Sequence, residues 1–360
     1  MAKKVNIETD LFGEEIVTVD LSDFLTGAKA MATLKLSRHV FEKVVSEGYL
    51  HKQEVNGKKM YSIAEVKAFM ETPRYRELQE GTVDKRNTLN DLTGKDWLPE
   101  TKSYFFQKGL GASHPDAQIE KLHPAPFSFQ DIEKLVAFFT KKGMQVLEPF
   151  GGVGSTAKAC ELLGRTCTSI ELSPKYHELS LLRLEKEVGE GTSKKHNFIN
   201  GDSCEVLKTL ETGSFDFMVT SPPYWGILNK QDQKVIKERV ANNLDTKYSD
   251  DEKDLGNVEN YSEFLDILCN RIFLQCARLL RKGKYMAIII SDFRDKNEYI
   301  SFHSDLIQHL NKADIPEGGH LVLQGTKILI QNHKSLLPYG YPFGYVENIH
   351  HQYILIFKKQ

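Results

Sequence analysis

Short apolar runs alternate with glycine-rich or polar turns along the middle of the chain. The run at 145–148 leads into a glycine-rich turn and then into a helical pattern that extends to residue 163. Further predicted strands at 165–171 and 197–203 carry acidic residues near their ends, and a fourth, at 215–220, precedes a turn with two prolines. This succession of strand, turn and helix is typical of an α/β sheet domain.

The N-terminal region has a different pattern. Residues 36–48 combine a serine start, apolar positions at helical spacing and a glycine stop, which predicts a helix. Residues 49–61 alternate around Asn56-Gly57, a strong hairpin signal, and a second helix is predicted at 63–70. We therefore expect a small domain at 1–73, a charged linker at 74–96 and the sheet domain at 97–360.

The helix, basic hairpin and helix of the small domain resemble the winged-helix modules of excisionase and MerR-like DNA-binding proteins. The resemblance implies a DNA-recognition domain, in which the first helix approaches a major groove and lysines of the hairpin contact phosphate. A packing domain with solvated lysines is the alternative. The candidate DNA-binding residues are Ser37, Arg38, His39, Lys43, Lys58 and Lys59.

The glycine-rich turn after residue 148 is a candidate ligand site. Glycines permit positive φ and close approach of the backbone, so a ligand can lie against the turn and the start of the next helix. A nicotinamide or flavin enzyme would use a similar turn. Glu171 is placed to accept hydrogen bonds from ribose hydroxyls, and Asp202 from an adenine amine. An ordinary strand-end or helix-cap carboxylate is the alternative for each.

The turn Ser221-Pro222-Pro223-Tyr224 follows the strand at 215–220. Two prolines fix φ and remove two N–H donors, so the turn offers acceptors: the Ser221 hydroxyl and the Pro222 carbonyl. Tyr224 adds an aromatic face on which an unstacked base can lie. These groups suit a site that grips a planar base by its exocyclic amine; a rigid polar turn is the alternative.

Together these motifs, in this order, resemble the amino-group DNA methyltransferases, and the resemblance covers about residues 90–360. It implies a Rossmann-like, seven-stranded sheet, S-adenosylmethionine as cofactor and catalysis by Ser221, Pro222, Pro223 and Tyr224. Glu148 stands where the family usually has aspartate. The implied cofactor-binding residues are Ser128, Glu148, Pro149, Phe150, Gly151, Gly152, Gly154, Ser155, Thr156, Glu171 and Asp202.

The resemblance also implies the reaction and the partners. The expected substrate is an exocyclic amine of a base that is flipped out of double-stranded DNA. Ser221 at the first catalytic position favours the cytosine 4-amino group, and the adenine 6-amino group is the alternative. A cognate restriction endonuclease is a candidate partner. An RNA or protein-amide methyltransferase and a non-catalytic DNA-binding regulator remain open as other classes.

Composition adds limits. The net charge of −2 means that DNA affinity would have to come from local basic patches. The five cysteines show no Cys-x-x-Cys spacing and no ring-attacking Pro-Cys motif, and no apolar run reaches transmembrane length. We expect a reduced, cytoplasmic protein with no metal and no membrane partner.

The location of DNA recognition follows from the order of the motifs. The runs at 319–330 and 351–357 are expected to be antiparallel strands that close the sheet, which leaves no room for a recognition domain at the C-terminus. Recognition therefore falls to residues 1 to about 90, to the polar insertion at 229–254, or to both.

Overall fold

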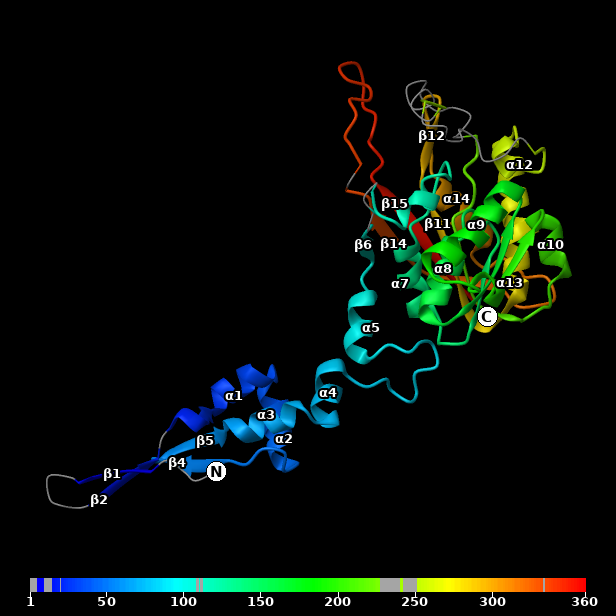
Figure 1. The fold of residues 1–360 in the computed structure, drawn as a ribbon. Coiled ribbons are helices and arrows are strands. Elements are labelled where there is room, and N and C mark those ends of the chain that lie inside the picture. The colour runs from blue at the N-terminus through cyan, green and yellow to red at the C-terminus, as the bar shows by residue number, and fades with distance from the viewer. Residues whose placement is uncertain are drawn as a thin grey trace. The chain divides into compact units, whose positions relative to one another are not determined.

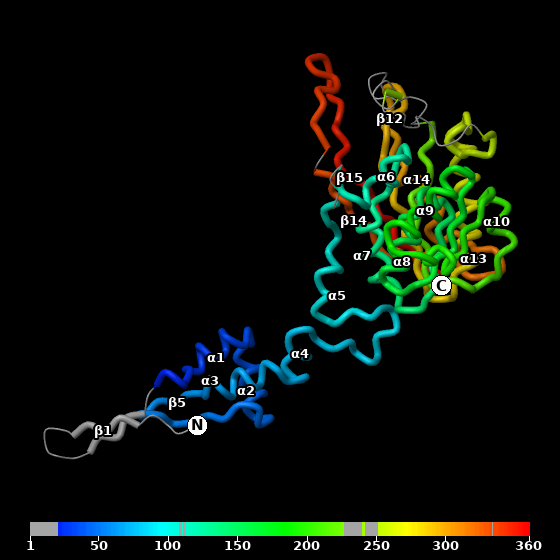
Figure 2. The backbone as a smooth tube through the Cα atoms, viewed as in Figure 1, coloured from blue at the N-terminus to red at the C-terminus, as the bar shows by residue number. Residues whose placement is uncertain are grey.

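The computed structural model describes residues 5–9, 15–19, 21–107, 110, 113–226, 240–241, 251–332 and 334–360. The chain divides into two compact units, drawn in Figures 1 and 2. The first comprises Met1–Asp84 with Thr93–Lys95, and the second Lys85–Leu92 with Asp96–Gln360. The domain limits at 73 and 97 stay a prediction, and part of the expected linker is a helix, Pro73–Glu80.

The first unit pairs a three-stranded antiparallel sheet, in the order β3-β5-β4, with helices. The helices predicted at 36–48 and 63–70 are present as α2 and α3. The hairpin at Asn56-Gly57 is confirmed, because both residues have the positive φ of 49° and 72° that such a turn needs. The elements are β1 (Val5–Thr9), β2 (Glu15–Val19), a 3-10 turn (Leu21–Asp23), β3 (Phe24–Thr26), α1 (Gly27–Leu34), α2 (Arg38–Ser46), β4 (Gln53–Val55), β5 (Lys58–Ser62), α3 (Ile63–Met70) and α4 (Pro73–Glu80).

A separate hydrophobic core holds this unit together. Phe41 and Val44 of α2 lie three positions apart, so they share one helix face and pack against Leu34 and Phe69. The Phe41 ring meets the Tyr61 ring edge-on at 5.0 Å. Tyr75 and Leu78 of α4, in the expected linker, pack against this core as well.

The second unit contains one sheet, in the order β6-β14-β15-β11-β10-β7-β8-β9. Strands β9, β8, β7, β10 and β11 are parallel, and β15 is antiparallel to both of its neighbours, β11 and β14. These are the seven expected strands, and β6 extends the edge by pairing with β14. The strands are β6 (Tyr104–Phe106), β7 (Gln145–Glu148), β8 (Thr166–Glu171), β9 (Asn197–Asn200), β10 (Phe215–Thr220), β11 (Leu280–Ile290), β14 (Leu321–Ile330) and β15 (His351–Lys359), with a separate hairpin of β12 (Phe293–Asp295) and β13 (Glu298–Ile300).

Helices cover both faces of the sheet. Alternate residues of β10 point to opposite faces: Met218 joins the core beneath α10, α12, α13 and α14, while Phe217 and Val219 join the core beneath α7, α8 and α9. The helices are α5 (Gly94–Glu100), α6 (Ala117–Glu120), α7 (Phe129–Phe139), α8 (Ser155–Leu163), α9 (Pro174–Glu187), α10 (Ser203–Thr209), α12 (Tyr261–Asp266), a π-helix (Ile267–Phe273), α13 (Leu274–Leu279) and α14 (Phe302–Leu310), with 3-10 turns at Ser193–Lys195 and Leu255–Asn257.

The parallel order of β7, β8, β9 and β10 determines where the polar motifs lie. The carboxyl ends of parallel strands meet at one edge of a sheet, and the glycine turn, Glu171, Asp202 and the proline turn all follow such ends. All six residues of β10 are buried, so the proline turn emerges directly from the core.

Two features of composition can be checked in the structure. The five cysteines are buried and none forms a disulfide. Within the ranges that the structure describes, no helix combines the length and the apolar character that crossing a bilayer requires.

Candidate active site

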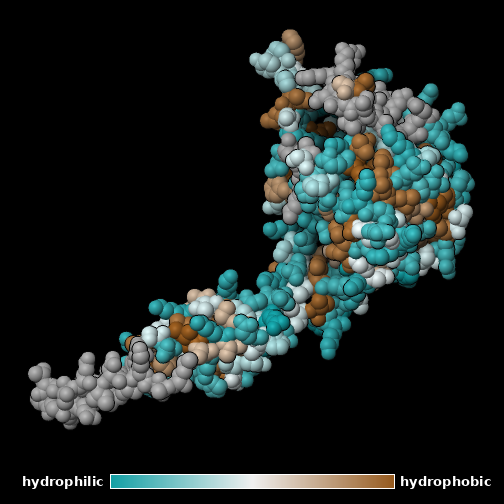
Figure 3. Space-filling model, in the orientation of Figure 1, coloured by the Kyte–Doolittle hydropathy of each residue, from teal (hydrophilic) through white to brown (hydrophobic). Residues whose placement is uncertain are grey.

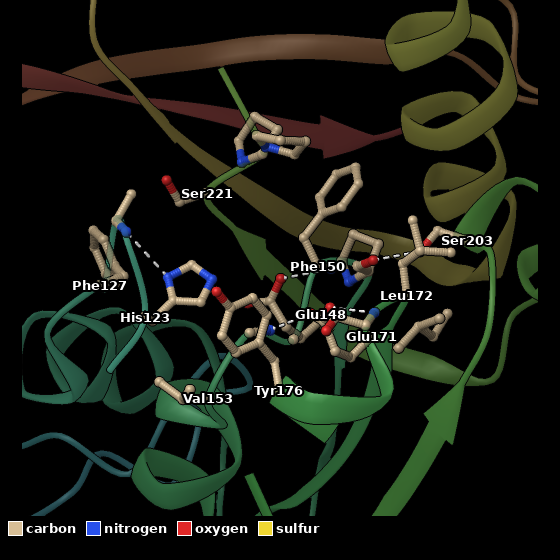
Figure 4. Close-up of a pocket in the computed structure, with 18 of the residues that line it drawn as sticks. His123, Phe127, Glu148, Phe150, Val153, Glu171, Leu172, Tyr176, Ser203 and Ser221 are labelled. Carbon is tan, nitrogen blue, oxygen red and sulfur yellow. Dashed lines mark hydrogen bonds between the residues drawn. The ribbon is translucent and has the colours of Figure 1, made fainter. Parts of the chain in front are cut away.

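One pocket at the carboxyl edge of the sheet is lined by both predicted motifs (Figure 4). The glycine turn and the proline turn, about 70 residues apart in sequence, contribute to the same cavity. This shared opening is what a reaction between a bound cofactor and a bound base requires. The predicted residues that line it are Glu148, Pro149, Phe150, Gly151, Gly152, Ser155, Thr156, Glu171, Asp202, Ser221, Pro222, Pro223 and Tyr224.

The three glycines of the turn have different tasks. A Cβ on Gly151 would lie 2.2 Å from the Ser169 Oγ, and one on Gly154 would lie 2.9 Å from the Ser180 Cβ, so both residues permit close packing within the protein. Gly152, with φ of 50°, lies beneath the His123 ring at the pocket wall. Gly154 is the N-cap residue of α8, with φ of 77°. Of the three, Gly152 is the glycine that lies next to His123 in the pocket lining.

Glu148 is a buried hub that joins the two motifs. Its Oε2 accepts a 2.7 Å hydrogen bond from the Thr156 hydroxyl at the start of α8. Its Oε1 accepts from the Phe150 N–H at 3.1 Å and from the hydroxyl of Thr220, the residue before the proline turn. Burial raises the pKa of Glu148 to about 8, against the opposing effect of these donors. The hydrogen bonds from Thr156, Phe150 and Thr220 therefore fix the position of the Glu148 carboxyl group.

Glu171 closes the other side of the glycine turn. One oxygen accepts from the Gly152 N–H at 2.7 Å and the other from the Ser173 N–H at 2.8 Å. Burial raises the pKa of Glu171 to about 7, and the two backbone donors oppose that rise. Since these backbone bonds use one acceptor position of each oxygen, the carboxylate retains capacity for hydroxyl donors from a ligand.

Asp202 lies at the start of a helix. Strand β9 ends at Asn200, earlier than the end expected from the sequence, because Asp202 is the N-cap residue of α10. Its Oδ1 accepts from the Cys204 N–H at 2.9 Å. This bond uses one carboxylate oxygen, and the side chain still lines the pocket. The next residue, Ser203, donates its hydroxyl to the Pro149 carbonyl and so fixes this corner to the glycine turn.

The segment before α7 is tied to the glycine turn by Ser155. The Ser155 hydroxyl donates to the Phe127 carbonyl at 2.6 Å and accepts from Arg183 at 2.9 Å. Ser155 is thus largely committed within the protein. Ser128, expected to bind the cofactor, is the buried N-cap residue of α7, and the neighbouring Phe127 lines the pocket instead.

All four residues of the proline turn line the cavity, and Ser221 lies above Glu148 in Figure 4. Pro222 is buried, whereas Ser221 and Tyr224 are partly exposed. The Tyr224 hydroxyl accepts from the Gln352 Nε2 at 3.1 Å, and the side chain packs against the core. Burial raises the pKa of Tyr224 to about 12, so the phenol stays protonated near neutral pH.

Trp225, the residue after the proline turn, packs against the core. Its indole N–H donates to the Val258 carbonyl at 2.9 Å, and its ring lies 5.2 Å from that of Tyr261. The segment at 123–128, which the family resemblance places beside the methionine end of the cofactor, contributes Ala125, Pro126 and Phe127 to the pocket. Leu172, Tyr176 and Lys253 also line it, and no motif in the sequence marks them.

The candidate DNA-binding residues lie on the surface of the first unit. Ser37 is the N-cap residue of α2. Arg38 pairs with Glu42 at 2.9 Å, and Lys43 lies 3.9 Å from Glu47, so acidic neighbours offset both charges. His39, Lys58 and Lys59 are exposed. Of the polar insertion at 229–254, residues 229–239 and 242–250 lie outside the described ranges.

Comparison with solved structures gives distant matches. TrmN of Thermus thermophilus is 15% identical with a TM-score of 0.41, and the match covers 71% of this chain and 55% of that one. A protein of Clostridium thermocellum described as an rRNA-methylase is 13% identical, with a TM-score of 0.40 and coverage of 66% and 99%. A second Thermus thermophilus protein, described as a DNA modification methylase and solved in complex with S-adenosyl-L-methionine, is 26% identical, with a TM-score of 0.30 and coverage of 44% and 53%.

The chain thus spans about half the length of two of these three structures. No curated protein matches the sequence. Residues 48–182 match the model of a family described as DNA methylase, N6_N4_Mtase. The matched range holds the glycine turn and Glu171 and ends before the proline turn. The match agrees with the resemblance that the motifs indicated: residues 48–182 are similar to the N6_N4_Mtase family of DNA methylases.

Proposed function

We propose that this protein transfers a methyl group from S-adenosylmethionine to an exocyclic amine of a base in double-stranded DNA, with the cytosine 4-amino group favoured. One observation carries the proposal: the glycine turn and the proline turn line a single pocket. The similarity of residues 48–182 to a family described as DNA methylase supports the reaction class and the cofactor. A cognate restriction endonuclease and a cytoplasmic location belong to the same proposal.

The residues of the pocket fit the cofactor. Glu171 offers acceptor positions for ribose hydroxyls beside the Gly152 turn, and Asp202 offers an oxygen for an adenine amine. The Phe150 ring supplies an apolar wall near both. When bound there, S-adenosylmethionine supplies a methyl group on a cationic sulfonium. The protein contributes the orientation of that group and a partly buried surrounding.

The proline turn acts on the amine. The lone pair of an aromatic amine is delocalised into the ring, which makes the nitrogen a poor nucleophile. The Ser221 hydroxyl and the Pro222 carbonyl accept hydrogen bonds from the two N–H groups of the amine. These hydrogen bonds pull the nitrogen toward tetrahedral geometry and localise the lone pair. Attack on the methyl carbon then needs no covalent enzyme intermediate, in keeping with the five cysteines, which are all buried.

The base has to leave the duplex to reach this pocket. Flipping costs a few kcal/mol of lost stacking and pairing. In our proposal the Tyr224 ring recovers part of that cost by stacking on the flipped base, and Gln352 holds the ring through its hydroxyl. The winged-helix-like first unit would recognise DNA through the exposed residues of α2 and the lysines of β5.

Methyl transfer to nucleic acid tests the proposal. Purified protein is incubated with S-[methyl-³H]-adenosylmethionine and either duplex bacterial DNA or total RNA, and the products are digested to nucleosides. We expect label in DNA as N4-methylcytosine. Label as N6-methyladenine would correct the base, and label in RNA alone would replace the substrate class. Absence of transfer and of calorimetric cofactor binding would favour a DNA-binding regulator.

Two variants make the assay specific. Ser221→Ala removes one of the two acceptors for the amine, so we expect loss of activity with retained cofactor binding. Ser262→Ala changes an exposed serine at the start of α12 and serves as the matched control. Equal activity of the two variants would contradict the assigned role of Ser221.

A further inference from the structure

The connection between β14 and β15 carries exposed aromatic side chains that no part of the proposed mechanism uses. Tyr341, Phe343 and Tyr345 are 81%, 95% and 84% exposed, and Leu336 and Tyr339 are exposed as well. Soluble proteins rarely expose so many large apolar groups together without an interaction partner. We call residues 334–350 the aromatic loop. Figure 3 shows the projection beyond the sheet domain, which carries pale teal as well as brown residues.

The aromatic loop has a defined internal structure. The Asn348 side chain clasps Leu337, donating to its carbonyl and accepting from its N–H, both at 2.9 Å. The N–H groups of Phe343 and Gly344 donate to the Gly340 carbonyl at 2.7 and 2.8 Å. Gly340 has φ of 74°, and a Cβ there would lie 2.4 Å from the Gly344 carbonyl. The rings are thus presented on an ordered support, which lowers the entropy cost of binding.

The aromatic loop emerges at the edge of the sheet that holds the active site. Strand β15 is antiparallel to both β11 and β14, so β14 runs in the direction of β10 and ends at the same edge as Ser221. At the base of the loop, the Gln331 N–H donates to the His350 carbonyl at 2.8 Å. Two residues further on, Gln352 donates to the Tyr224 hydroxyl at 3.1 Å. The strand that follows the loop, β15, therefore contacts the proposed base-stacking residue.

We infer that the aromatic loop inserts into duplex DNA at the position that the flipped nucleotide leaves. The inference rests on the proposed function. When a nucleotide flips out, the faces of the adjacent bases and of the base with which it was paired become exposed. Aromatic rings stack on such faces. The residues at 339, 341, 343 and 345 supply rings at every second position, and the loop leaves the sheet at the edge where Tyr224 lines the pocket. These rings would stabilise the opened duplex, whereas Tyr224 holds the flipped base itself.

The test compares duplex DNA with the same DNA converted to single strands by heat. The triple variant Tyr341→Ala/Phe343→Ala/Tyr345→Ala removes the rings, and Tyr341→Phe/Phe343→Tyr/Tyr345→Phe retains them. Leu98→Ala, at a residue that is 71% exposed outside the loop, is the matched control. We expect kcat/KM of the alanine variant to fall about tenfold or more on duplex DNA and to change about twofold or less on single strands. The ring-retaining variant and the control should match the wild type.

The outcomes separate this inference from the proposed function. A wild type that methylates neither form of DNA refutes the proposed function. A wild type that methylates duplex DNA, with an alanine variant that does so equally well, overturns the role of the loop alone. An equal loss on both forms, or a loss that accompanies a changed oligomeric mass in sedimentation, also overturns it, because the rings would then serve another contact. Cofactor affinity and thermal unfolding of each variant confirm that the fold and the pocket are intact.

Discussion

The Thr220 hydroxyl donates a hydrogen bond to Glu148, whose other oxygen accepts from Thr156 at 2.7 Å. Thr220 ends β10 and immediately precedes Ser221, while Glu148 ends β7 and precedes the glycine turn. One buried carboxyl group therefore sets the position of both motifs. Where the family usually has aspartate, the longer glutamate side chain spans from the end of β7 to both hydroxyls.

Loss of the Thr220 hydroxyl should impair catalysis more than cofactor binding. Thr220→Val keeps the shape but removes the donor to Glu148, so the proline turn loses its link to the glycine turn. We expect kcat to fall about tenfold while the calorimetric Kd for S-adenosylmethionine changes little, since positioning errors act on the transition state. Thr209→Val, at an exposed position on α10, is the control. A change in Kd with unaltered kcat would contradict the link.

The raised pKa of Glu148 should make stability fall as pH rises. Its pKa is about 8 in the folded protein and 4.5 as the ordinary value. Between these values the folded state binds more protons than the unfolded state, so the free energy of unfolding decreases with pH, on the order of 1 kcal/mol per pH unit. Glu171, with a pKa of about 7, adds to the same trend.

Glu148→Gln isolates the contribution of that group, because the amide does not titrate. Urea unfolding from pH 5 to 8 should show a flatter dependence for this variant, with a gain in relative stability toward pH 8. Glu178→Gln, at an exposed position on α9, should retain the wild-type slope. If the free energy of unfolding changed with pH at the same slope for the wild type and Glu148→Gln, the Glu148 carboxyl group would be ionised over the whole range from pH 5 to 8.

Gly151 should tolerate no side chain unless Ser169 changes with it. A Cβ on Gly151 would meet the Ser169 Oγ at 2.2 Å and the Ser169 Cβ at 3.5 Å. Gly151→Ala should therefore destabilise the protein by about 1–3 kcal/mol. Ser169→Ala removes the closest atom, so the double variant should recover part of that loss. A double-mutant cycle by urea unfolding measures the coupling, and strict additivity would show that the clash is relieved elsewhere.

Glu171 should be needed for cofactor affinity. Glu171→Gln replaces one acceptor oxygen with a donor that faces the N–H of Gly152 or Ser173. We expect the calorimetric Kd for S-adenosylmethionine to rise about tenfold, which corresponds to the loss of about one charge-assisted hydrogen bond. Glu178→Gln again provides the control. Unchanged affinity would place the ribose elsewhere in the pocket.

Much of this site could be predicted because its signals are local. Asn56-Gly57 fixes a hairpin by its φ values, and the Gly151–Gly154 turn marks a strand-to-helix junction. The proline turn is readable for the same reason. By contrast, the task of Glu148 depends on Thr220, 72 positions away, and no sequence spacing reveals such a pair. Asp202 was predicted as a strand end, since the apolar pattern before it conceals a helix cap.

The C-terminal region shows the limit of pattern reading most clearly. The strands expected at 319–330 and 351–357 are present as β14 and β15, and no motif marks the residues between them. Aromatic residues ordinarily indicate core, so their exposure in the aromatic loop is visible only in three dimensions. The residues that could contact DNA therefore extend beyond the two segments expected from the sequence.

Tyr224 should act through its ring, with its hydroxyl serving to hold that ring in place. The hydroxyl accepts from Gln352 at 3.1 Å and also interacts with the Ser221 side chain and the Ser291 backbone, so Tyr224→Phe keeps the stacking face but loses these contacts. We expect Tyr224→Phe and Gln352→Leu each to lower kcat/KM on duplex DNA about threefold, whereas Tyr224→Ala, which also loses the ring, lowers it about thirtyfold or more. Tyr104→Ala, on the exposed edge strand β6, should match the wild type.

Combining Tyr224→Phe with Gln352→Leu should add little to either change, because both break the hydrogen bond between Tyr224 and Gln352. Additive losses in the double variant would mean that Gln352 acts through a contact other than the one to Tyr224, such as that with Gln331. A Tyr224→Ala variant as active as Tyr224→Phe would remove the ring from the mechanism.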